Sequence, residues 1–338
     1  MLNSRLRPLP RRNYPTIDTN TSEAPVPTPN FENKNEPDEE EDQEDIFSSF
    51  LGHLFPDDAP AFHGDPGQHL LYSSPRYGNL DIMVPSYPSS SENRNEEIAA
   101  GQKKNDGTVN AVDEGRKLFA HFLWSAAMVV AEGVEEADMP FVKGGGRERG
   151  YKGGKGDLGG AALPSVICAL ANATTVAATD HPSSPALSGA IAFNTSYNLS
   201  NRNPPVNAAI SMHPHEWGVL SDPFSTANKG KFSRICAADC FWMPEQHENL
   251  TRTMQWFLSP GGKVWIVAGF HTGRPIVAQF FETAVRGGFV VERIFERDTV
   301  ERLEGGGEIR REWMPEREGE SVDNRKRWCV VAVLRRAE

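Results

Sequence analysis

A stretch near the middle of the chain holds residues suited to binding a nucleotide-like ligand. A glycine-rich turn at 157–161 leads into a helix-compatible segment, 163–171, and a β-rich run at 173–179 then ends on Asp180. The glycines let backbone N–H groups approach a ligand closely, and the helix dipole favours a negative group at that end. Asp180 lies 21 residues past Gly159, about the spacing at which a doubly wound fold places the carboxylate that binds ribose hydroxyls. The pattern therefore indicates a cofactor site. The alternative is an ordinary glycine turn before a helix, without a ligand.

A second set of candidate residues follows another strand that ends on an acid, 234–239 (RICAAD). Asp239 would lie at the carboxyl end of this strand, and Trp242, three positions on, completes an Asp-x-x-aromatic pattern. A carboxylate beside aromatic faces suits a cationic amine or a sulfonium, because the ring face attracts positive charge. His247 and His271 lie on neighbouring loops, and we expect each to orient its loop rather than to act as a base. The sequence shows no nucleophilic triad, phosphate-binding loop or paired-carboxylate set.

Elements that could hold these residues at one edge of a sheet alternate through the second half of the chain. Strands alternating with helices of about 10 to 15 residues predict a doubly wound, mostly parallel α/β sheet with helices on both faces. The closing pair of strands flanks a charged excursion and predicts an antiparallel edge strand. The predicted strands cover 207–212, 234–239, 262–270, 289–295 and 327–334, and the predicted helices cover 245–258 and 275–286. The polar Asn/Ser-rich segment 194–203 predicts a loop that ends a helix begun near Pro185.

The segment before the glycine-rich turn combines a strong helix pattern with a weak strand. Apolar residues recur at three- and four-residue steps across 112–131, which predicts a long helix with Asp113 as its cap. The first strand of a parallel sheet should follow as a continuous apolar run, but 141–156 holds seven glycines and five basic residues. We therefore expect the first strand to be short, displaced or malformed.

Composition predicts three regions. Residues 1–44 are rich in Pro, Asn and Glu, with eight acids in the run 36–45, and we expect a disordered acidic tail. Residues 45–111 form an N-terminal extension, with a short helical segment, a β-hairpin within 69–88 and a flexible insertion. Residues 112–338 form the main domain.

Charge and cysteine content argue against several classes of protein. A net charge of −11 and a pI near 5.4 disfavour direct nucleic-acid binding through phosphate contacts. Four scattered cysteines suit reduced thiols in a cytoplasmic or nuclear protein better than a disulfide framework. Cys236 and Cys240 lack the partners that would complete a zinc site, and no apolar run reaches the roughly 20 residues that span a bilayer. We therefore expect no metal, no membrane association and a cytoplasmic location, with the nucleus as the alternative.

Five segments together carry a resemblance to a known family. They are 117–127 (KLFAHFLWSAA), 157–170, 179–182 (TDHP), 215–218 (HEWG) and 237–274, which is the most specific of them. The sequence resembles the class I S-adenosylmethionine-dependent methyltransferases. More narrowly, it resembles the fungal nicotinamide N-methyltransferase-like proteins, relatives of the elongation factor 1-alpha N-terminal and lysine methyltransferases. The resemblance covers most of residues 65–335 and implies a seven-stranded Rossmann-like sheet with S-adenosyl-L-methionine as cofactor.

The resemblance also implies residue roles, each with a plainer alternative: core packing for the two tryptophans beside the cofactor, a helix N-cap for Asp180 and a loop cap for Asp239. One departure is that KGGKGD, residues 152–157, replaces the apolar strand and Glu-Leu-Gly motif of the family. In the implied roles, Trp124 lies against the cofactor, Asp157, Gly159 and Ala161 form the cofactor turn, Asp180 binds the ribose hydroxyls, Trp217 packs beside the adenine, and Asp239 faces the methyl group beside Trp242, which lines the acceptor pocket.

These observations predict a monomeric N-methyltransferase that acts on a protein lysine or N-terminal amine. A nicotinamide-like small amine is the alternative acceptor. A catalytically degenerate methyltransferase fold, kept as a binding protein, is the alternative outside enzymes, and the weak first strand is its best support. A nicotinamide-dinucleotide oxidoreductase is disfavoured, because it would need a fuller G-x-G-x-x-G motif.

Overall fold

The computed structural model describes residues 2–10, 62–86, 122–137, 155–158 (backbone only), 162–200, 202–203, 205–305 and 307–338. Several predictions fall outside these residues and are not described further: the helical segment at 46–55, the flexible insertion, the Asp113 cap, and the turn residues Gly159 and Ala161. In the described part, no helix is both long and apolar enough to cross a membrane.

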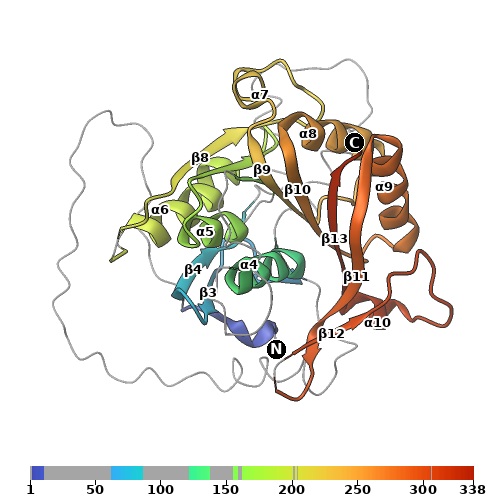
Figure 1. Cartoon of the computed structure of the whole chain (residues 1–338). Coiled ribbons are helices and arrows are strands. Elements are labelled where there is room, and N and C mark those ends of the chain that lie inside the picture. Colours follow the sequence, from blue (N-terminus) through green and yellow to red (C-terminus); the bar gives the residue numbers. More distant parts are fainter. Residues whose placement is uncertain are drawn as a thin grey trace, which may run out of the picture.

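A central sheet dominates the fold, with strand order β12-β11-β13-β10-β9-β6-β7-β8 (Figure 1). The run from β8 to β10 is parallel, and β13 is antiparallel to both β10 and β11. The predicted doubly wound, mostly parallel α/β fold is confirmed. The strands are β6 (Lys155–Leu158), β7 (Thr175–Asp180), β8 (Ala209–Pro214), β9 (Phe232–Ala238), β10 (Leu258–Gly269), β11 (Phe289–Arg302), β12 (Glu308–Arg311) and β13 (Trp328–Arg336).

The sheet differs from the predicted one at its antiparallel side. Among the described residues, the central sheet has eight strands rather than seven, because the four-residue β12 folds back onto β11. The reversed strand β13 consequently lies two places inside the edge, where its main chain is paired on both sides.

The topological switch point lies at β6. This four-residue strand is flanked by β7 and β9, so the strand order runs in opposite directions on its two sides. Its backbone is in register with both neighbours, Leu158 pairing with Thr179 of β7 and with Ala237 of β9. The first strand is therefore short, as its composition suggested, yet central. The carboxyl ends of β7 and β9 consequently meet at one edge, where doubly wound folds bind their ligands.

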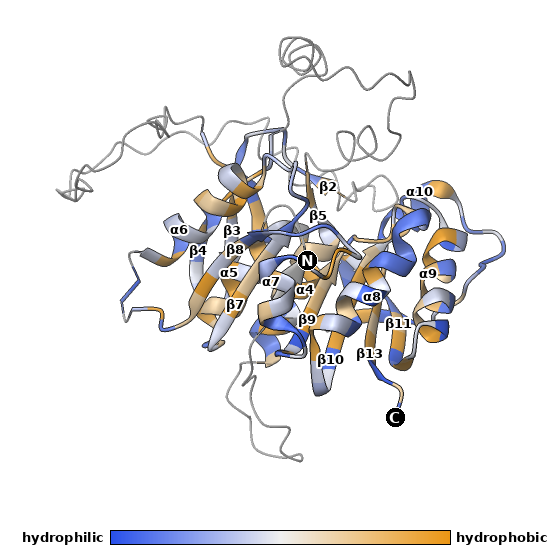
Figure 2. Ribbon diagram, turned by 90° about the horizontal axis from the view of Figure 1, so that it is seen from above, coloured by the Kyte–Doolittle hydropathy of each residue, from blue (hydrophilic) through white to orange (hydrophobic). Residues whose placement is uncertain are grey.

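Helices cover both faces of the sheet and enclose two apolar clusters. One face carries α4 (Ser125–Ala137), α5 (Leu163–Leu170) and α6 (Ala192–Ser200) and the other carries α7 (Pro223–Asn228), α8 (His247–Phe257) and α9 (Arg274–Arg286). Alternate residues of β10 serve the two sides: Val267 belongs to the α4–α5 cluster, and Ile266 belongs to the α8–α9 cluster. Figure 2 shows apolar colouring along the central strands between these helix layers.

Two predicted helix boundaries are wrong, and tertiary contacts explain both. In the described part of the helix predicted over 112–131, Leu123–Trp124 instead form strand β5, which pairs with β2 (Phe62–His63), and α4 begins at Ser125; residues 112–121 lie outside the described residues. The polar segment predicted as a loop at 194–203 is largely helical as α6. There the amides of Asn194 and Asn198 hydrogen-bond both backbone groups of Met83 and Asp81, so polar side chains dock the helix on a strand edge.

The predicted hairpin is present as β3 (His69–Ser74) and β4 (Gly78–Met83). The predicted disorder of 1–44 is wrong for residues 2–10. There η1 (Asn3–Arg5) leads into β1 (Leu6–Pro8), which pairs antiparallel with β3. Leu2 is buried, and Arg5 forms ion pairs with Glu132 and Glu135 of α4 at 2.6 and 2.7 Å. Strand pairing and buried ion pairs therefore order a segment whose composition is poor in apolar residues.

The remaining elements complete the second apolar layer and the excursion after β11. The π-helix η3 (Leu187–Ile191) precedes α6, and the short 3-10 helix η4 (Pro244–Gln246) precedes α8. Between β12 and β13, α10 (Val322–Lys326) begins at Ser321, whose hydroxyl accepts a hydrogen bond from the Asn324 N–H. The predicted helices at 245–258 and 275–286 correspond to α8 and α9 within three residues at each end.

Candidate functional site

Asp239 lies directly after β9 at the switch-point edge, in the left-handed region with φ of 53°. Its Oδ1 accepts a hydrogen bond of 2.7 Å from the Gly269 N–H at the end of β10, and the Ala126 N–H in the first turn of α4 also donates to the carboxylate. The side chain is 6% exposed. Asp239 therefore joins the ends of two strands to the start of a helix, and its carboxylate faces backbone donors rather than solvent.

The environment of Asp239 shifts its protonation equilibrium. Burial raises the pKa of this carboxyl, while the nearby His271 and the two backbone N–H groups act to lower it. A buried carboxylate that keeps its charge needs such donors, because water cannot solvate it.

His271, on the loop after β10, lies against both Asp239 and Trp124. Its ring stacks on the Trp124 indole, with centroids 4.3 Å apart and planes inclined by 28°. Its Nδ1 lies 3.9 Å from Asp239 Oδ1. Burial lowers the pKa of His271, and the Asp239 charge acts in the opposite direction. The structure thus brings together Trp124, Asp239 and His271.

The small β2–β5 pairing holds Trp124 from the other side. Phe62 pairs with Trp124 across these two strands and contacts its ring edge-on at 5.5 Å. Next to it, His63 Nε2 hydrogen-bonds Ser125 Oγ at 3.0 Å, and burial lowers the pKa of His63 to about 4. Sequence reasoning missed His63, because a lone histidine about 60 residues before its partner forms no local pattern.

The loop after Asp239 carries Trp242, which is half-buried. His247 fixes this loop: its Nε2–H donates to the Phe241 carbonyl at 2.9 Å. Phe241 also stacks on Phe280 of α9, with centroids 3.7 Å apart. His247 therefore orients its loop as expected, and the loop places Trp242 beside the acid-ended strand.

Asp180 ends β7 and shapes the loop that follows it. Its Oδ1 accepts the His181 N–H at 2.7 Å, and its Oδ2 accepts the Ser184 hydroxyl at 2.8 Å. These bonds shape a turn and are not the helix N-cap named as the alternative, because the N-cap of the next helix, η3, is Ala186. A carboxylate has about four lone-pair sites, and this one is half-buried, so it retains capacity for donors of a ligand.

The loop of Trp217 lies beside Asp180. The His215 N–H donates to the Asp180 carbonyl at 2.8 Å, which joins the ends of β7 and β8. Trp217 is half-buried and packs on the α8–α9 cluster. Gly218, with φ of 85°, turns the chain there, and its N–H donates to Thr253 Oγ1 at 2.8 Å. Asp180 and Trp217 therefore form a polar and a flat aromatic surface at one strand edge.

The start of α5 closes the site on the β6 side. Asp157 is in register with Ala178 of β7 and Cys236 of β9, and its backbone therefore lies at the centre of the sheet. Ala162 adopts φ of 52° just before α5, which turns the chain sharply into the helix. The backbone groups of this helix start face the same edge as Asp180 and Asp239, an arrangement that suits the negative end of a ligand.

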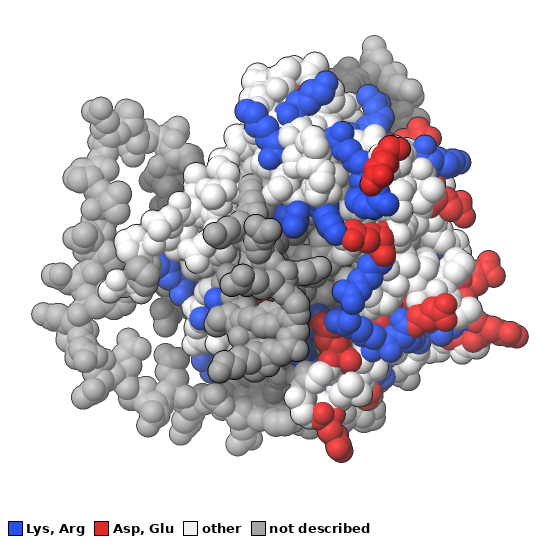
Figure 3. Space-filling view, viewed as in Figure 1, with Lys and Arg blue, Asp and Glu red and all other residues white. Residues whose placement is uncertain are grey.

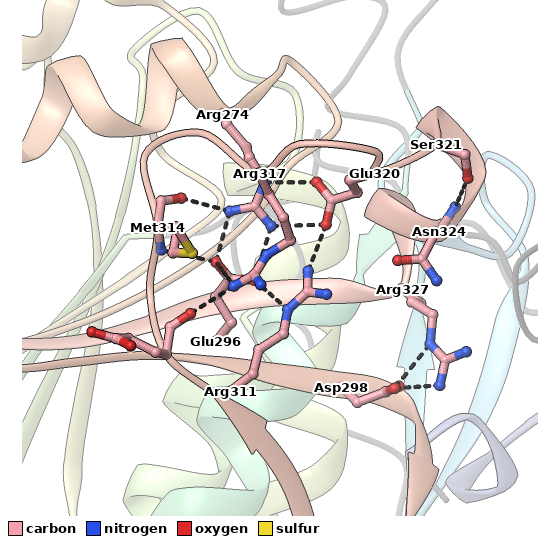
Figure 4. A network of polar contacts seen from close by, with 11 residues as sticks. Arg274, Glu296, Asp298, Arg311, Met314, Arg317, Glu320, Ser321, Asn324 and Arg327 are labelled. Atoms are coloured by element: carbon pink, nitrogen blue, oxygen red, sulfur yellow. Dashed lines mark hydrogen bonds and ion pairs between the residues drawn. The ribbon is translucent and has the colours of Figure 1, made fainter.

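Arg274 fixes the loop of His271, and sequence reasoning missed it. All five of its N–H groups are used (Figure 4): by Glu296, by Glu320 and by the Met314 carbonyl, at 2.6 to 2.9 Å. Its ring neighbour Phe270 stacks on Trp313, with centroids 5.8 Å apart. The sequence around Arg274 gave no local signal for these contacts, because Glu296 and Glu320 lie 22 and 46 residues away.

Comparison with known proteins places the chain beside named methyltransferases, although no family model matches it. The protein N-terminal and lysine N-methyltransferase EFM7 of Candida albicans is 31% identical over 192 residues, which cover 52% of this chain and 68% of that protein. The EFM7 of Eremothecium gossypii is 28% identical over 185 residues, covering 52% of this chain and 66% of that protein, just under two thirds of its length. The EFM7 of Yarrowia lipolytica is 26% identical over 219 residues, covering 59% and 76%.

Solved structures give weaker likenesses. A TehB-like SAM-dependent methyltransferase from Corynebacterium glutamicum has a TM-score of 0.39 and 16% identity, covering 74% of this chain and 100% of that chain. The [4+2]-cyclase SpnF has a TM-score of 0.40 and 14% identity, covering 62% and 80%. The sequence relatives are therefore the basis for assigning a family.

Proposed function

The chain belongs to the family of the protein N-terminal and lysine N-methyltransferases EFM7, and from this premise we propose that it transfers a methyl group from S-adenosylmethionine to an amine nitrogen of a protein. The acceptor would be a lysine side chain or an N-terminal amine. The observation that carries the proposal is the pair of acids at the switch point: Asp180 ends β7 and Asp239 follows β9, on either side of β6. Nucleotide-like ligands of doubly wound sheets bind at this edge.

The residues at this edge fit the cofactor. Asp180 can accept hydrogen bonds from a ribose diol, Trp217 offers a flat face to adenine, and the Trp124 indole suits a sulfonium cation. We propose that the turn of Asp157, Gly159 and Ala161 holds the methionine end. When bound, the cofactor supplies an electrophilic methyl carbon, so the protein has to orient the acceptor and exclude water.

On the acceptor side we propose a division of labour. Asp239, buried and bonded to backbone N–H groups, would fix the ends of β9 and β10 against α4. Trp242, half-buried on the next loop, would line the pocket for the acceptor amine. A rigid floor and an aromatic wall would keep the nitrogen in line with the methyl group, and such positioning can lower a barrier by several kcal/mol.

Calorimetric titration with S-adenosylhomocysteine tests the cofactor site. We expect micromolar binding to the wild type and an affinity about 10- to 100-fold weaker for Asp180→Ala, which loses one or two charge-assisted hydrogen bonds. Ser184→Ala is the matched control, because it removes the loop hydrogen bond to Oδ2 but keeps the carboxylate. Equal losses in the two variants would mean that Asp180 only shapes its loop. No binding to a folded wild type would overturn the methyltransferase proposal.

Methylation assays with peptides test the acceptor. A peptide with a free N-terminal amine and one lysine should gain methyl groups, and its N-acetylated and lysine-to-arginine forms would show which amine reacts. Nicotinamide serves as the small-molecule alternative. Transfer to nicotinamide but to no peptide or protein would contradict the protein acceptor.

Finer properties are proposed on narrower grounds. The four cysteines are buried and none of them forms a disulfide, which favours a reducing compartment such as the cytoplasm. Figure 3 shows basic and acidic side chains interspersed over one face, and this mixed charge favours a protein acceptor over a nucleic acid. We propose that the protein acts as a monomer, which sedimentation would test.

A further inference from the structure

Two histidines lie on neighbouring loops of the switch-point edge, and the structure separates their roles. His247 donates to the Phe241 carbonyl and orients its own loop. His271 instead stacks on Trp124 and faces Asp239. Building on the proposed function, we propose that His271 is the proton acceptor of the reaction: its Nε2 removes the proton from the bound acceptor ammonium. The nitrogen lone pair is then free for methylation.

The geometry selects which ring nitrogen would act. Nδ1 is the nitrogen on the Asp239 side, 3.9 Å from Oδ1. A carboxylate at that nitrogen favours the tautomer with the proton on Nδ1, which leaves the lone pair on Nε2. The ring fits closely over the end of β10, because a Cβ at Gly269 would lie 3.2 Å from Nδ1. Gly269 and Asp239 thus set the position and the tautomer of His271.

The proton balance is simple. The N–H bond of the acceptor ammonium breaks, its electron pair stays on nitrogen, and the proton joins Nε2 to give an imidazolium. Asp239 stabilises that cation through Nδ1–H and remains a carboxylate. The imidazolium later returns its proton to solvent. The step is needed because a protonated amine has no lone pair to donate, and the ordinary pKa of a lysine amine is about 10.4.

The surroundings of His271 favour a neutral ring at rest. Burial lowers its pKa, so the base form dominates at neutral pH. Among the described residues, Asp239 is the charged group that acts on the His271 pKa. Titratable groups on the neighbouring elements are His63, which hydrogen-bonds Ser125 beside Trp124, the Cys329 thiol of β13, whose pKa burial raises, and Arg274, which is bonded to Glu296 and Glu320.

The test combines kinetics with imidazole NMR of the protein free of ligand. For the wild type, we expect kcat on the peptide with a free N-terminal amine and one lysine to fall below pH 6.5, with a midpoint equal to the His271 pKa measured by NMR. His271→Gln should lower kcat at least about 100-fold, abolish that acid limb, and leave the Kd for S-adenosylhomocysteine within about threefold. NMR should show Nε2 without a proton at pH 7.

His247→Gln is the matched control, because it removes a histidine of the neighbouring loop and should keep the acid limb. An unchanged rate or a persisting limb in His271→Gln would overturn the inference alone. A proton on Nε2 at pH 7 would overturn it even if that variant did not fold. A wild type that binds the cofactor product but methylates no acceptor would overturn the proposed function, and this inference with it.

Discussion

At the scale of single residues, two carboxylates and one glycine define what the site can do. Asp180 is half-buried and bonds its own loop, whereas Asp239 is buried and bonds other elements. Asp180 lies at the proposed cofactor site, whereas Asp239 is a structural joint between β9, β10 and α4. Gly133 acts at a distance from both: it lets α4 lie close to β10, so the Ala126 N–H can reach Asp239.

Gly133→Ala should destabilise the protein, although Gly to Ala inside a helix ordinarily stabilises by up to about 1 kcal/mol. An added Cβ would lie 2.1 Å from the Trp265 ring, and the rigid indole cannot turn away, so overpacking should cost about 1–3 kcal/mol. Urea unfolding measures the change. Gly133→Ala with Trp265→Leu should be more stable than the sum of the two single changes predicts. A single variant as stable as the wild type would contradict the clash.

At the scale of elements, two charged contacts fix segments that have little apolar surface. The N-terminal segment 2–9 is held by the pairing of β1 with β3 and by the ion pairs of Arg5 with α4. The loop of His271 is held by Arg274 on the excursion after β11. α4 connects the first contact to the site, because its first turn bonds Asp239 and its last turns bond Arg5. The Arg5 and Arg274 contacts therefore fix segments on two sides of the candidate site.

Arg5→Met should cost about 3–5 kcal/mol, the range for a buried ion pair that loses one partner. Glu132 keeps its ion pairs with Arg297 and Arg302, but Glu135 would lose its ion pair with Arg5. Adding Glu135→Gln should recover most of the loss. Arg7→Met, on the exposed side of β1, serves as the control and should change stability by less than about 0.5 kcal/mol. Chemical unfolding of the wild type and the three variants measures these changes. Equal losses of stability in Arg5→Met and Arg7→Met would contradict the role of Arg5 in holding the N-terminal segment.

Arg274→Lys should loosen the loop of His271, because an ammonium has three donors and cannot form the two forked contacts of a guanidinium. We expect a loss of at least about 2 kcal/mol from the broken charge-assisted hydrogen bonds. Arg317→Lys is the matched control, since Arg317 touches Glu296 at 3.5 Å and is 24% exposed. Thermal and urea unfolding would measure the loss of stability in each variant. Equal small effects in both variants would mean that the Arg274 contacts are replaceable.

The elements that were predictable from sequence are those with local patterns. The hairpin 69–83, the acid-ended strands and α8 and α9 follow from alternation, helical spacing and turn residues. Asp180 and Asp239 were predicted at the carboxyl ends of two strands, and the structure places them at the end of β7 and directly after β9. The position of Trp124 beside the cofactor was implied by the family resemblance alone. The family roles of all the site residues remain predictions: Trp124, Asp157, Gly159, Ala161, Asp180, Trp217, Asp239 and Trp242.

The failures share a physical cause, which is contact over a long sequence separation. Arg5 and Glu135 are 130 residues apart, so composition alone gave disorder for residues 2–10. Trp124 left the predicted helix because it pairs with Phe62. Asn198 entered a helix because its amide bonds Asp81, 117 residues away. No window of neighbouring residues contains these partners.

At the scale of the whole molecule, acid acts on two sets of buried groups. Burial lowers the pKa of five histidines, so the folded state resists their protonation: His63, His213, His215, His247 and His271. Arginine contacts lower the pKa of Glu296 and Glu320, although burial acts the other way. Both sets make the unfolded chain bind more protons than the folded protein as the pH falls.

We therefore expect the free energy of unfolding to fall in two pH windows. Between pH 6.5 and about 4, the unfolded chain gains protons on histidines that stay neutral in the fold, so stability drops. Below about 4.5 the glutamates protonate in the unfolded chain first, and their contribution is lost through their lowered folded pKa. His63→Gln should flatten the upper window and Glu320→Gln the lower. Urea unfolding across pH 3–8 tests this, and a profile flat from 6.5 to 4.5 would contradict it.

The buried Glu132 also limits how early the domain can complete its folding during synthesis. It lies on α4, and its partners Arg297 and Arg302 follow it by 165 and 170 residues. At about 5–20 residues per second, these arginines leave the ribosome roughly 10–30 s later. Until then α4 carries a carboxylate that lacks two of its counter-charges, and the sheet lacks β11. Closure of this domain therefore belongs to the end of translation, and a nascent chain stalled before Arg297 would expose its apolar half-sheet to chaperones.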